Sequence, residues 1–302
     1  MINLDNVSKI FKSDLLNQPF TALKNVTFEI PEGSMIGFLG ANGAGKTTSL
    51  KIIMDFIKPS SGSVNFSPKL GRSRNEILKN IGFLPERPYF YPSLTGRDFV
   101  HFMGKLSGMS RSEVNDSLST LSPRFKIDHA LDRELKTYSK GMLQRIGFMA
   151  TIIHRPMLIV LDEPLSGLDP IGRKEIKDII IDLHKEGKTV FFSTHIVPDV
   201  EEVCDRVVFL KEGGLIYDGP VQQLLHQKMQ NDIIVVFRNP DNYEIKTPAE
   251  KIQNLPDMLT KVRIKEINQE SLLHEILQNK YSLISFDYVK PSLEDIFYQL
   301  RN

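Results

Sequence analysis

Short apolar runs alternate with amphipathic segments over the first two thirds of the chain. Unbroken apolar runs bounded by polar residues are typical of strands that are buried on both faces of a parallel sheet. Runs of this form occupy residues 35–39, 157–161, 189–193 and 207–210. Segments with helical spacing of apolar residues, at 47–57 and 171–185, follow the first two runs. This alternation of strand and helix predicts an α/β sheet.

Two regions depart from that alternation. Residues 26–30 alternate between apolar and polar side chains before a turn at residues 31–33, which predicts an N-terminal β layer. Between about residues 87 and 153, apolar residues recur at helical spacing, so we expect a largely helical insert. The helices expected inside it span residues 98–106, 111–121 and 141–153.

The last part of the chain differs in its sequence pattern from the first part and contains no catalytic motif that we can identify. We therefore expect a first domain over residues 1–220 and a small α+β accessory domain over residues 221–302. The expected elements of the second domain are helices at 221–229, 271–278 and 292–300 and strands at 233–237, 261–267 and 282–289.

Charge and cysteine content narrow the possible functions. The chain has 38 basic and 37 acidic residues, and no basic run forms an arm or stripe, so we expect no nucleic-acid partner. Cys204 is the only cysteine, which excludes an internal disulfide and a metal site built on several thiolates. We see no secretory signal and no run approaching the ~18 to 20 apolar residues that span a bilayer. We expect a cytoplasmic protein that reaches a membrane only through partners.

One loop carries the strongest chemical signal in the chain. It fits the pattern G-x-x-x-x-G-K-[ST], in which backbone N–H groups surround phosphate oxygens. The residues of this loop are Gly40, Ala41, Asn42, Gly43, Ala44, Gly45, Lys46, Thr47 and Thr48. Lys46 can place its charge at the β and γ phosphates, and the Thr47 hydroxyl can bind Mg²⁺. A glycine-rich turn is the alternative, but the flanking strand and helix favour binding of a nucleoside triphosphate.

Polar residues follow two of the other buried strands. Asp162 and Glu163 end one strand, where Asp162 suits the Mg²⁺ shell and Glu163 suits the base that polarises a water. The alternative is an acidic pair that caps a helix before Pro164. His195 follows the next strand and could contact the γ phosphate or orient the water, although a lone histidine is more often structural.

Taken together, these motifs resemble the nucleotide-binding subunits of ABC transporters over about residues 1–220. Residues 138–145, Tyr-Ser-Lys-Gly-Met-Leu-Gln-Arg, look like the signature of that family, residues 158–163 like its Walker B strand, and residues 165–169 like its D-loop. His195 looks like its switch histidine. The resemblance implies a P-loop fold with a mostly parallel sheet core, an N-terminal antiparallel β layer and a helical insert.

The resemblance also implies roles for residues whose function the sequence motifs by themselves do not indicate. Phe11 sits where the family stacks an aromatic ring on adenine, although it could also be a core phenylalanine. Ser139 and Gly141 would contact the γ phosphate of ATP held by an opposite subunit, and Asp169 would join the nucleotide-binding residues. Lys46 would act with Glu163 and His195 in catalysis.

Two positions depart from the family pattern. Lys140 and Met142 replace residues of the usual Ser-Gly-Gly-Gln signature, and Lys140 could either attract the phosphate or face solvent. Glu86 stands where most members have a glutamine that senses Mg²⁺ and the attacking water, so we count it among the nucleotide and metal ligands. Both variants, and the ending at residues 290–297, resemble a bacterial exporter branch with a small C-terminal domain.

The expected function is therefore an ATPase that uses ATP and Mg²⁺. Two copies of the chain would form a homodimer around two ATP molecules and would drive export through a separately encoded transmembrane permease. That permease would hold the subunit at the inner face of the cell membrane. The resemblance implies that it docks on the aromatic segment at residues 87–92, although this segment could instead be a packed loop that covers the helical insert.

Two other classes of protein compete with this interpretation. A soluble ABC-type ATPase acting on nucleic acid or the ribosome usually has a long coiled-coil insertion or two cassettes, whereas this chain has one phosphate loop and no heptad run. A GTPase or kinase would leave the signature unexplained, and the chain lacks an Asn-Lys-x-Asp guanine pattern.

Overall fold

The computed structural model describes all residues except 13–18, 228–231, 290–292, 295 and 298–302. The chain divides into two compact units, with residues 1–221 in the first and residues 222–300 in the second. Each unit is described by itself.

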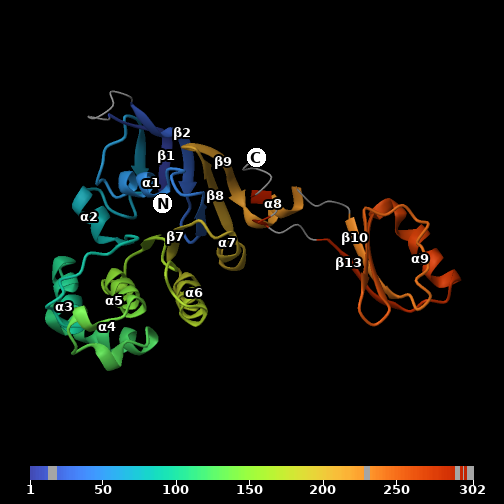
Figure 1. The fold of residues 1–302 in the computed structure, drawn as a ribbon. Helices are drawn as coiled ribbons and strands as arrows, with labels where there is room; N and C mark the ends of the chain where they lie inside the picture. The colour runs from blue at the N-terminus through green and yellow to red at the C-terminus, as the bar shows by residue number, and fades with distance from the viewer. Residues whose placement is uncertain (13–18, 228–231, 290–292, 295, 298–302) are drawn as a thin grey trace. The chain divides into compact units, whose positions relative to one another are not determined.

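A six-stranded sheet forms the centre of the first unit (Figure 1). Its strands, in spatial order, are β5 (Ile81–Leu84), β6 (Leu158–Asp162), β7 (Thr189–Thr194), β3 (Met35–Leu39), β8 (Arg206–Lys211) and β9 (Gly214–Pro220). All neighbours are parallel except β8 and β9. Every residue of β3, β6 and β7 is buried, which explains why their central residues are all apolar. The expected α/β sheet is confirmed.

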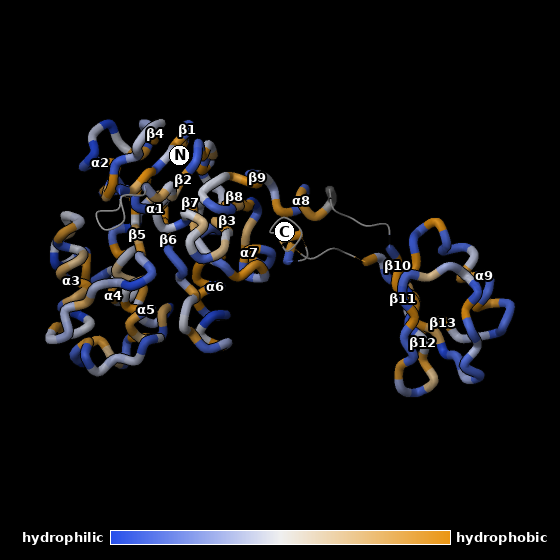
Figure 2. The backbone as a smooth tube through the Cα atoms, turned by 45° about the horizontal axis from the view of Figure 1, so that its top comes forward, coloured by the Kyte–Doolittle hydropathy of each residue, from blue (hydrophilic) through white to orange (hydrophobic). Residues whose placement is uncertain are grey.

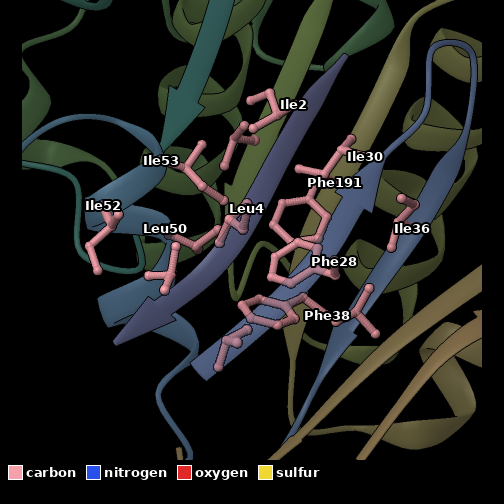
Figure 3. Close-up of a cluster of buried hydrophobic side chains, with 14 of the residues drawn as sticks. Ile2, Leu4, Phe28, Ile30, Ile36, Phe38, Leu50, Ile52, Ile53 and Phe191 are labelled. Carbon is pink, nitrogen blue, oxygen red and sulfur yellow. The ribbon is translucent and has the colours of Figure 1, made fainter. Parts of the chain in front are cut away.

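A three-stranded antiparallel layer packs on this sheet. It is built from β1 (Ile2–Phe11), β2 (Phe20–Ile30) and β4 (Ser61–Phe66), with β1 in the middle. Phe28 of β2, Phe38 of β3 and Phe191 of β7 meet at the centre of the shared core, with ring centroids 5.1–5.9 Å apart (Figure 3). Leu50 and Ile53 of α1 (Lys46–Ile53) close the same core. The helix that carries the end of the phosphate loop is thus anchored to both β structures.

Helices surround the sheet. The helical insert contains α3 (Gly96–Leu106), α4 (Arg111–Arg124) and α5 (Lys140–Ile152), which lie together in Figure 1. These helices begin after Thr95, Ser110 and Ser139, and in each case the hydroxyl accepts a backbone N–H from the first turn. The other helices of the unit are α2 (Arg74–Lys79), α6 (Pro170–Lys185) and α7 (Val197–Val203).

The structure corrects some of the expected elements of the first unit. The helix expected at 47–57 ends at Ile53, because Asp55 has a left-handed φ of 56°. Several elements were not expected at all, namely β4, β5, β9, α2 and α7. In β5, the residue Gly82 obscures the strand pattern; a Cβ there would lie 2.4 Å from the carbonyl oxygen of Thr151, so close packing requires glycine.

The second unit contains a four-stranded antiparallel sheet and a helix. The strand order is β11 (Lys251–Leu255), β12 (Leu259–Lys265), β10 (Asp232–Arg238) and β13 (Leu283–Tyr288). Buried and less buried residues alternate along β12 and, from Ile233, along β10. The buried face packs against Leu272 and Ile276 of α9 (Gln269–Gln278), and hydrophobic residues of this unit are orange in Figure 2. This arrangement matches the small α+β fold that was expected.

Details of this unit differ from the expectation. The strand expected at 261–267 ends at Lys265, because Lys265 pairs with Asp232, the first residue of β10, and a 3₁₀ turn follows. Strand β11 was not expected. Helix α8 (Val221–Gln227) is described to Gln227, so the expected end at 229 lies outside the described residues. Most of the helix expected at 292–300 also lies outside them.

Candidate nucleotide-binding site

The phosphate loop lies at the carboxyl end of β3 and leads into α1, and it lines a cavity of about 480 Å³. Among the described residues, most of the expected nucleotide-binding side chains meet at this cavity. They are Ala41, Asn42, Gly43, Gly45, Lys46, Thr47, Thr48, Glu86, Glu163 and His195. Gly40, Ala44 and Asp162 are buried beside them. The carboxyl ends of β3, β6 and β7 meet here because these strands are neighbours in the sheet.

Two glycines of the loop, Gly45 and Gly43, have a positive φ, which disfavours any residue with a side chain. Gly45 has φ +106°, and a Cβ there would lie 2.8 Å from the carbonyl oxygen of Ala22. Gly43 has φ +82°, with open space where a Cβ would stand. The loop therefore keeps backbone N–H groups exposed to the cavity at the N-terminus of α1, where the helix dipole favours an anion. This is the geometry expected for phosphate binding.

Lys46 is buried beneath the loop. Its Nζ donates to the carbonyl oxygen of Gly40 at 2.7 Å and lies 3.6 Å from Oε1 of Glu163. Burial lowers the pKa of Lys46, while the negative charges of Glu163 and Asp162 oppose that shift. The ammonium group therefore joins the phosphate loop to the carboxylates that follow β6.

Asp162 lies at the end of β6 with both carboxylate oxygens in hydrogen bonds. The Thr47 hydroxyl donates to Oδ2 at 3.1 Å, and the Ser193 hydroxyl donates to Oδ1. Burial raises the pKa of Asp162, and these two hydrogen bonds oppose the increase.

The oxygen donors at this point suit a divalent cation. The Thr47 hydroxyl, the Asp162 carboxylate and the Glu86 carboxylate at the same cavity are of the type that Mg²⁺ prefers. Within the described parts of the chain, no three His, Cys, Asp or Glu side chains converge as a metal centre. The residues therefore fit a Mg²⁺ ion that also takes oxygens from phosphate and water, as this ion usually does.

Glu163 and His195 form the other polar pair of the cavity. Nδ1 of His195 lies 3.0 Å from Oε2 of Glu163, and the Glu163 side chain is only 12% exposed. Glu163 has a left-handed φ of 50°, which is uncommon for a residue with a side chain. Its carboxylate thereby lies between Lys46 and His195.

The remaining expected residues lie elsewhere in the first unit. Phe11 ends β1 and is 39% exposed, with Nζ of Lys9 5.2 Å from its ring centroid. Phe20, which pairs with Phe11 across the β1–β2 ladder, lines the cavity instead. Ser139 and Asp169 accept backbone N–H groups at the starts of α5 and α6, and neither lines the cavity; nor does Gly141.

The structure also places the unusual signature lysine. A Cβ built on Gly167 would lie 1.9 Å from Nζ of Lys140, so the lysine side chain lies against the Gly167 backbone. Gly167 has φ +71°, a conformation that glycine adopts at little cost. Lys140 is exposed, yet it contacts the D-loop of its own chain rather than pointing only into solvent.

Sequence reasoning did not single out Phe20, Ala22 and Ser166, which also line the cavity, or the contacts of Ser193. Phe20 begins β2, one strand before the strand that leads into the phosphate loop, so its position gave only a weak signal. Ser193 stands two residues before His195, and only the pairing of β6 with β7 brings it to Asp162.

The fold and this cavity define a P-loop nucleoside triphosphatase. The sequence model of the family described as "ABC transporter" matches residues 23–166. An uncharacterized ABC transporter ATP-binding protein of Synechocystis sp. is 33% identical over 96% of this chain and 82% of its own length. The bacitracin transport ATP-binding protein BcrA of Bacillus licheniformis is 31% identical over 97% of this chain and 98% of its own length.

Solved structures agree with these relatives. A dimeric structure of the ATP-binding cassette MJ0796 in a post-hydrolysis state, bound to ADP and Pi, superposes with a TM-score of 0.66 at 26% identity. The superposed region covers 73% of this chain and 99% of the MJ0796 chain. The chain therefore belongs to the ABC transporter family, as an ATP-binding subunit that hydrolyses ATP. In the described residues, no helix combines the length and apolar character needed to cross a membrane.

Proposed function

We propose that two copies of this chain enclose two ATP molecules and drive export through a separately encoded membrane permease. The observation that carries the dimer is the place of Ser139, which starts α5 and does not line the cavity that holds Lys46 and Glu163. A second copy could supply Ser139 and the N-terminus of its α5, whose positive end favours the γ phosphate. The dimeric relative MJ0796 supports the same arrangement.

Within each site, the side chains have different proposed roles, which follow from where they lie in the cavity. Thr47, Asp162 and Glu86 would hold Mg²⁺, which neutralises charge on the phosphate oxygens when it is bound. Lys46 binds the β and γ phosphates. Glu163 accepts a proton from the attacking water, because its carboxylate is the one that contacts both Lys46 and His195.

His195 orients that base. Its Nδ1 lies 3.0 Å from Glu163, so Nδ1–H can donate to the carboxylate and hold it in place. The other ring nitrogen, Nε2, is then the one that can reach a γ phosphate oxygen. Phe20 and Phe11, at the ends of β2 and β1, offer aromatic surface for the adenine.

A mixture of two inactive variants tests the shared site directly. One chain carries Lys46→Ala and the other Ser139→Ala, so each homodimer lacks an intact site. If Ser139 acts across the dimer, the mixed dimer has one complete site, and ATP hydrolysis should return on mixing. If hydrolysis stays at the level of the separate variants, Ser139 does not act in this way.

A control is needed because Ser139 also caps a helix. Ser110 caps α4 in the same manner and lies in a capping box with Glu113, outside the nucleotide cavity. Ser110→Ala should cost a similar ~1 kcal/mol of stability while retaining ATPase activity. Loss of activity in Ser110→Ala equal to that in Ser139→Ala would assign the Ser139 effect to capping alone.

The proposed permease-docking surface is a group of aromatic side chains on the helical insert. Tyr89 is 79% exposed, and its ring lies 5.5 Å from Tyr91, which lies 5.6 Å from Phe102 of α3. Leu106, at the end of α3, is 67% exposed. Exposed apolar groups that are this close together are typical of interaction surfaces, and a membrane permease fits both the family and this surface.

Copurification tests the partner. The protein, extracted from its native membranes in mild detergent, should bring with it a polytopic membrane protein, and Tyr89→Ala with Phe102→Ala should release it. Tyr288→Ala, an exposed aromatic of the second unit, is the control that should retain it. Recovery of ribosomes or nucleic acid in place of a membrane protein would favour the soluble ATPase class instead. ATP-dependent movement of substrate in inverted vesicles would decide the direction.

A further inference from the structure

Ser193 occupies a position that joins both carboxylate residues of the site. It lies near the end of β7, directly opposite Asp162 of β6 in the parallel ladder, and it has no solvent exposure. Its hydroxyl donates to Oδ1 of Asp162 and accepts the backbone N–H of Glu163 at 3.1 Å. One side-chain oxygen therefore contacts two consecutive residues, and any role of Ser193 in hydrolysis rests on the roles proposed above for Asp162 and Glu163.

The hydrogen bond from the Ser193 hydroxyl to Asp162 fixes the orientation of the Asp162 carboxylate. Ser193 donates to Oδ1 while Thr47 donates to Oδ2 at 3.1 Å, so a hydroxyl holds each oxygen. With Oδ1 held from the β7 side, Oδ2 stays directed at Thr47 and the phosphate loop. The two oxygens that fit a Mg²⁺ ion, from Thr47 and Asp162, are thereby kept together.

The second contact holds the backbone of Glu163. The Glu163 N–H is shared by the hydroxyl and the carbonyl oxygen of Ser193, at 3.1 and 3.2 Å. Glu163 needs this support because its φ of 50° is unfavourable for a residue with a side chain. In this conformation its carboxylate lies between Lys46 and His195.

We propose that Ser193 is a positioning residue for ATP hydrolysis, which orients Asp162 toward the divalent cation and Glu163 toward the attacking water. Ser193 does not line the nucleotide cavity, so it acts through these two residues and not by contact with ATP. Its loss should therefore change kcat and the Mg²⁺ requirement much more than the affinity for the nucleotide.

A pair of substitutions with the same shape isolates the hydroxyl. Ser193→Thr retains it, whereas Ser193→Val has nearly the same volume without it. We expect kcat of Ser193→Val to be lower than that of Ser193→Thr by about tenfold or more, the ratio expected for losing a hydrogen bond to a charged group. The Mg²⁺ concentration for half-maximal rate should rise several-fold, and binding of a fluorescent ATP analogue in EDTA should be unchanged.

Thr189 provides the matched control on the same strand. It is equally buried, at the other end of β7, and its hydroxyl accepts the backbone N–H of Gly33 at 2.8 Å. Thr189→Val should lower the melting temperature with kcat and the Mg²⁺ requirement unchanged. Ser193→Ala, which adds no volume, provides the same comparison with wild type if either larger side chain prevents folding.

The outcomes separate the proposal from general effects on stability. The proposal is supported if only the variants without a hydroxyl at position 193 have a lower kcat and need a higher Mg²⁺ concentration for half-maximal rate. Equal kcat in Ser193→Thr and Ser193→Val, or a deficit in Thr189→Val of the same size, would overturn it. The reference throughout is ATP hydrolysis by the wild-type chain, so the result does not depend on the permease or on the direction of transport.

Discussion

Gly45→Ala should show how tightly the phosphate loop is packed against β2. The wild-type residue has φ +106°, and an alanine Cβ would lie 2.6 Å from Leu23 Cδ2 and 2.8 Å from the carbonyl oxygen of Ala22. The leucine methyl can rotate away, but the backbone oxygen cannot move without shifting β2. The substitution therefore combines backbone strain with a clash that the loop has to relieve.

The expected size follows from these two contributions. Strain at positive φ costs an alanine about 1–2 kcal/mol, and overpacking against backbone adds about 1–3 kcal/mol. Because the loop can relieve the clash by moving into the cavity, part of the total should appear as weaker ATP binding. A loss of about 1.4–2.8 kcal/mol in binding corresponds to about 10- to 100-fold in Kd.

Gly187→Ala supplies the matched comparison. Gly187 follows α6 with φ +85°, and nothing lies within 4 Å of the position of its Cβ. This variant should show the strain alone, with normal ATP affinity. Urea unfolding and calorimetric ATP titration measure both quantities for both variants. If Gly45→Ala were no less stable than Gly187→Ala and bound ATP as tightly as wild type, the close packing of the loop would be refuted.

Three further predictions concern charge and burial. Glu86→Gln should raise the Mg²⁺ concentration needed for half-maximal ATPase rate several-fold, since it removes a carboxylate from the cavity; an unchanged titration would exclude Glu86 from the metal site. Burial alone would raise the pKa of Asp232, but hydrogen bonds from Lys265 and Arg263 hold it below its ordinary value. The ionised form therefore favours the fold, so protection of the β10 amides against hydrogen exchange, relative to the intrinsic rate at each pH, should decrease as pH falls below about 4, and Asp232→Asn should lose that pH dependence. Burial raises the pKa of the Cys204 thiol well above its usual value, so a thiol reagent should modify it only on unfolding, and fast labelling of the folded protein would contradict this burial.

The sequence allowed accurate prediction where a single segment carries its own signal. Strand β3 and the loop after it could be located because a buried parallel strand is apolar throughout and phosphate binding needs glycines at set positions. Strand β5 was missed because Gly82, which its packing requires, interrupts the pattern. The expected end of α1 was wrong because Asp55 adopts a left-handed conformation that helical spacing does not reveal.

Contacts between distant segments account for most of what the sequence did not reveal. Ser193 is 31 residues from Asp162, and their hydrogen bond depends on the register of two strands. The contact of Lys140 with Gly167 likewise depends on how the start of α5 packs on the loop after β6. Motif spacing locates the residues of a site, but pairing between elements decides which of them touch.

The order of the strands explains why three segments are enough to bring Lys46, Glu163 and His195 together. Strands β6, β7 and β3 are adjacent and parallel, so all three end at one edge and each delivers a different group. The loop after β3 brings Lys46, β6 brings Glu163, and β7 brings His195, which together form one chain of contacts at 3.6 and 3.0 Å. The start of α5 belongs to the helical insert and stands outside that edge. Under the proposed function, Glu163 and the Mg²⁺ ligands lie at one edge of the sheet and Ser139 lies on a separate element, a division that suits coupling of hydrolysis to the closure of two subunits.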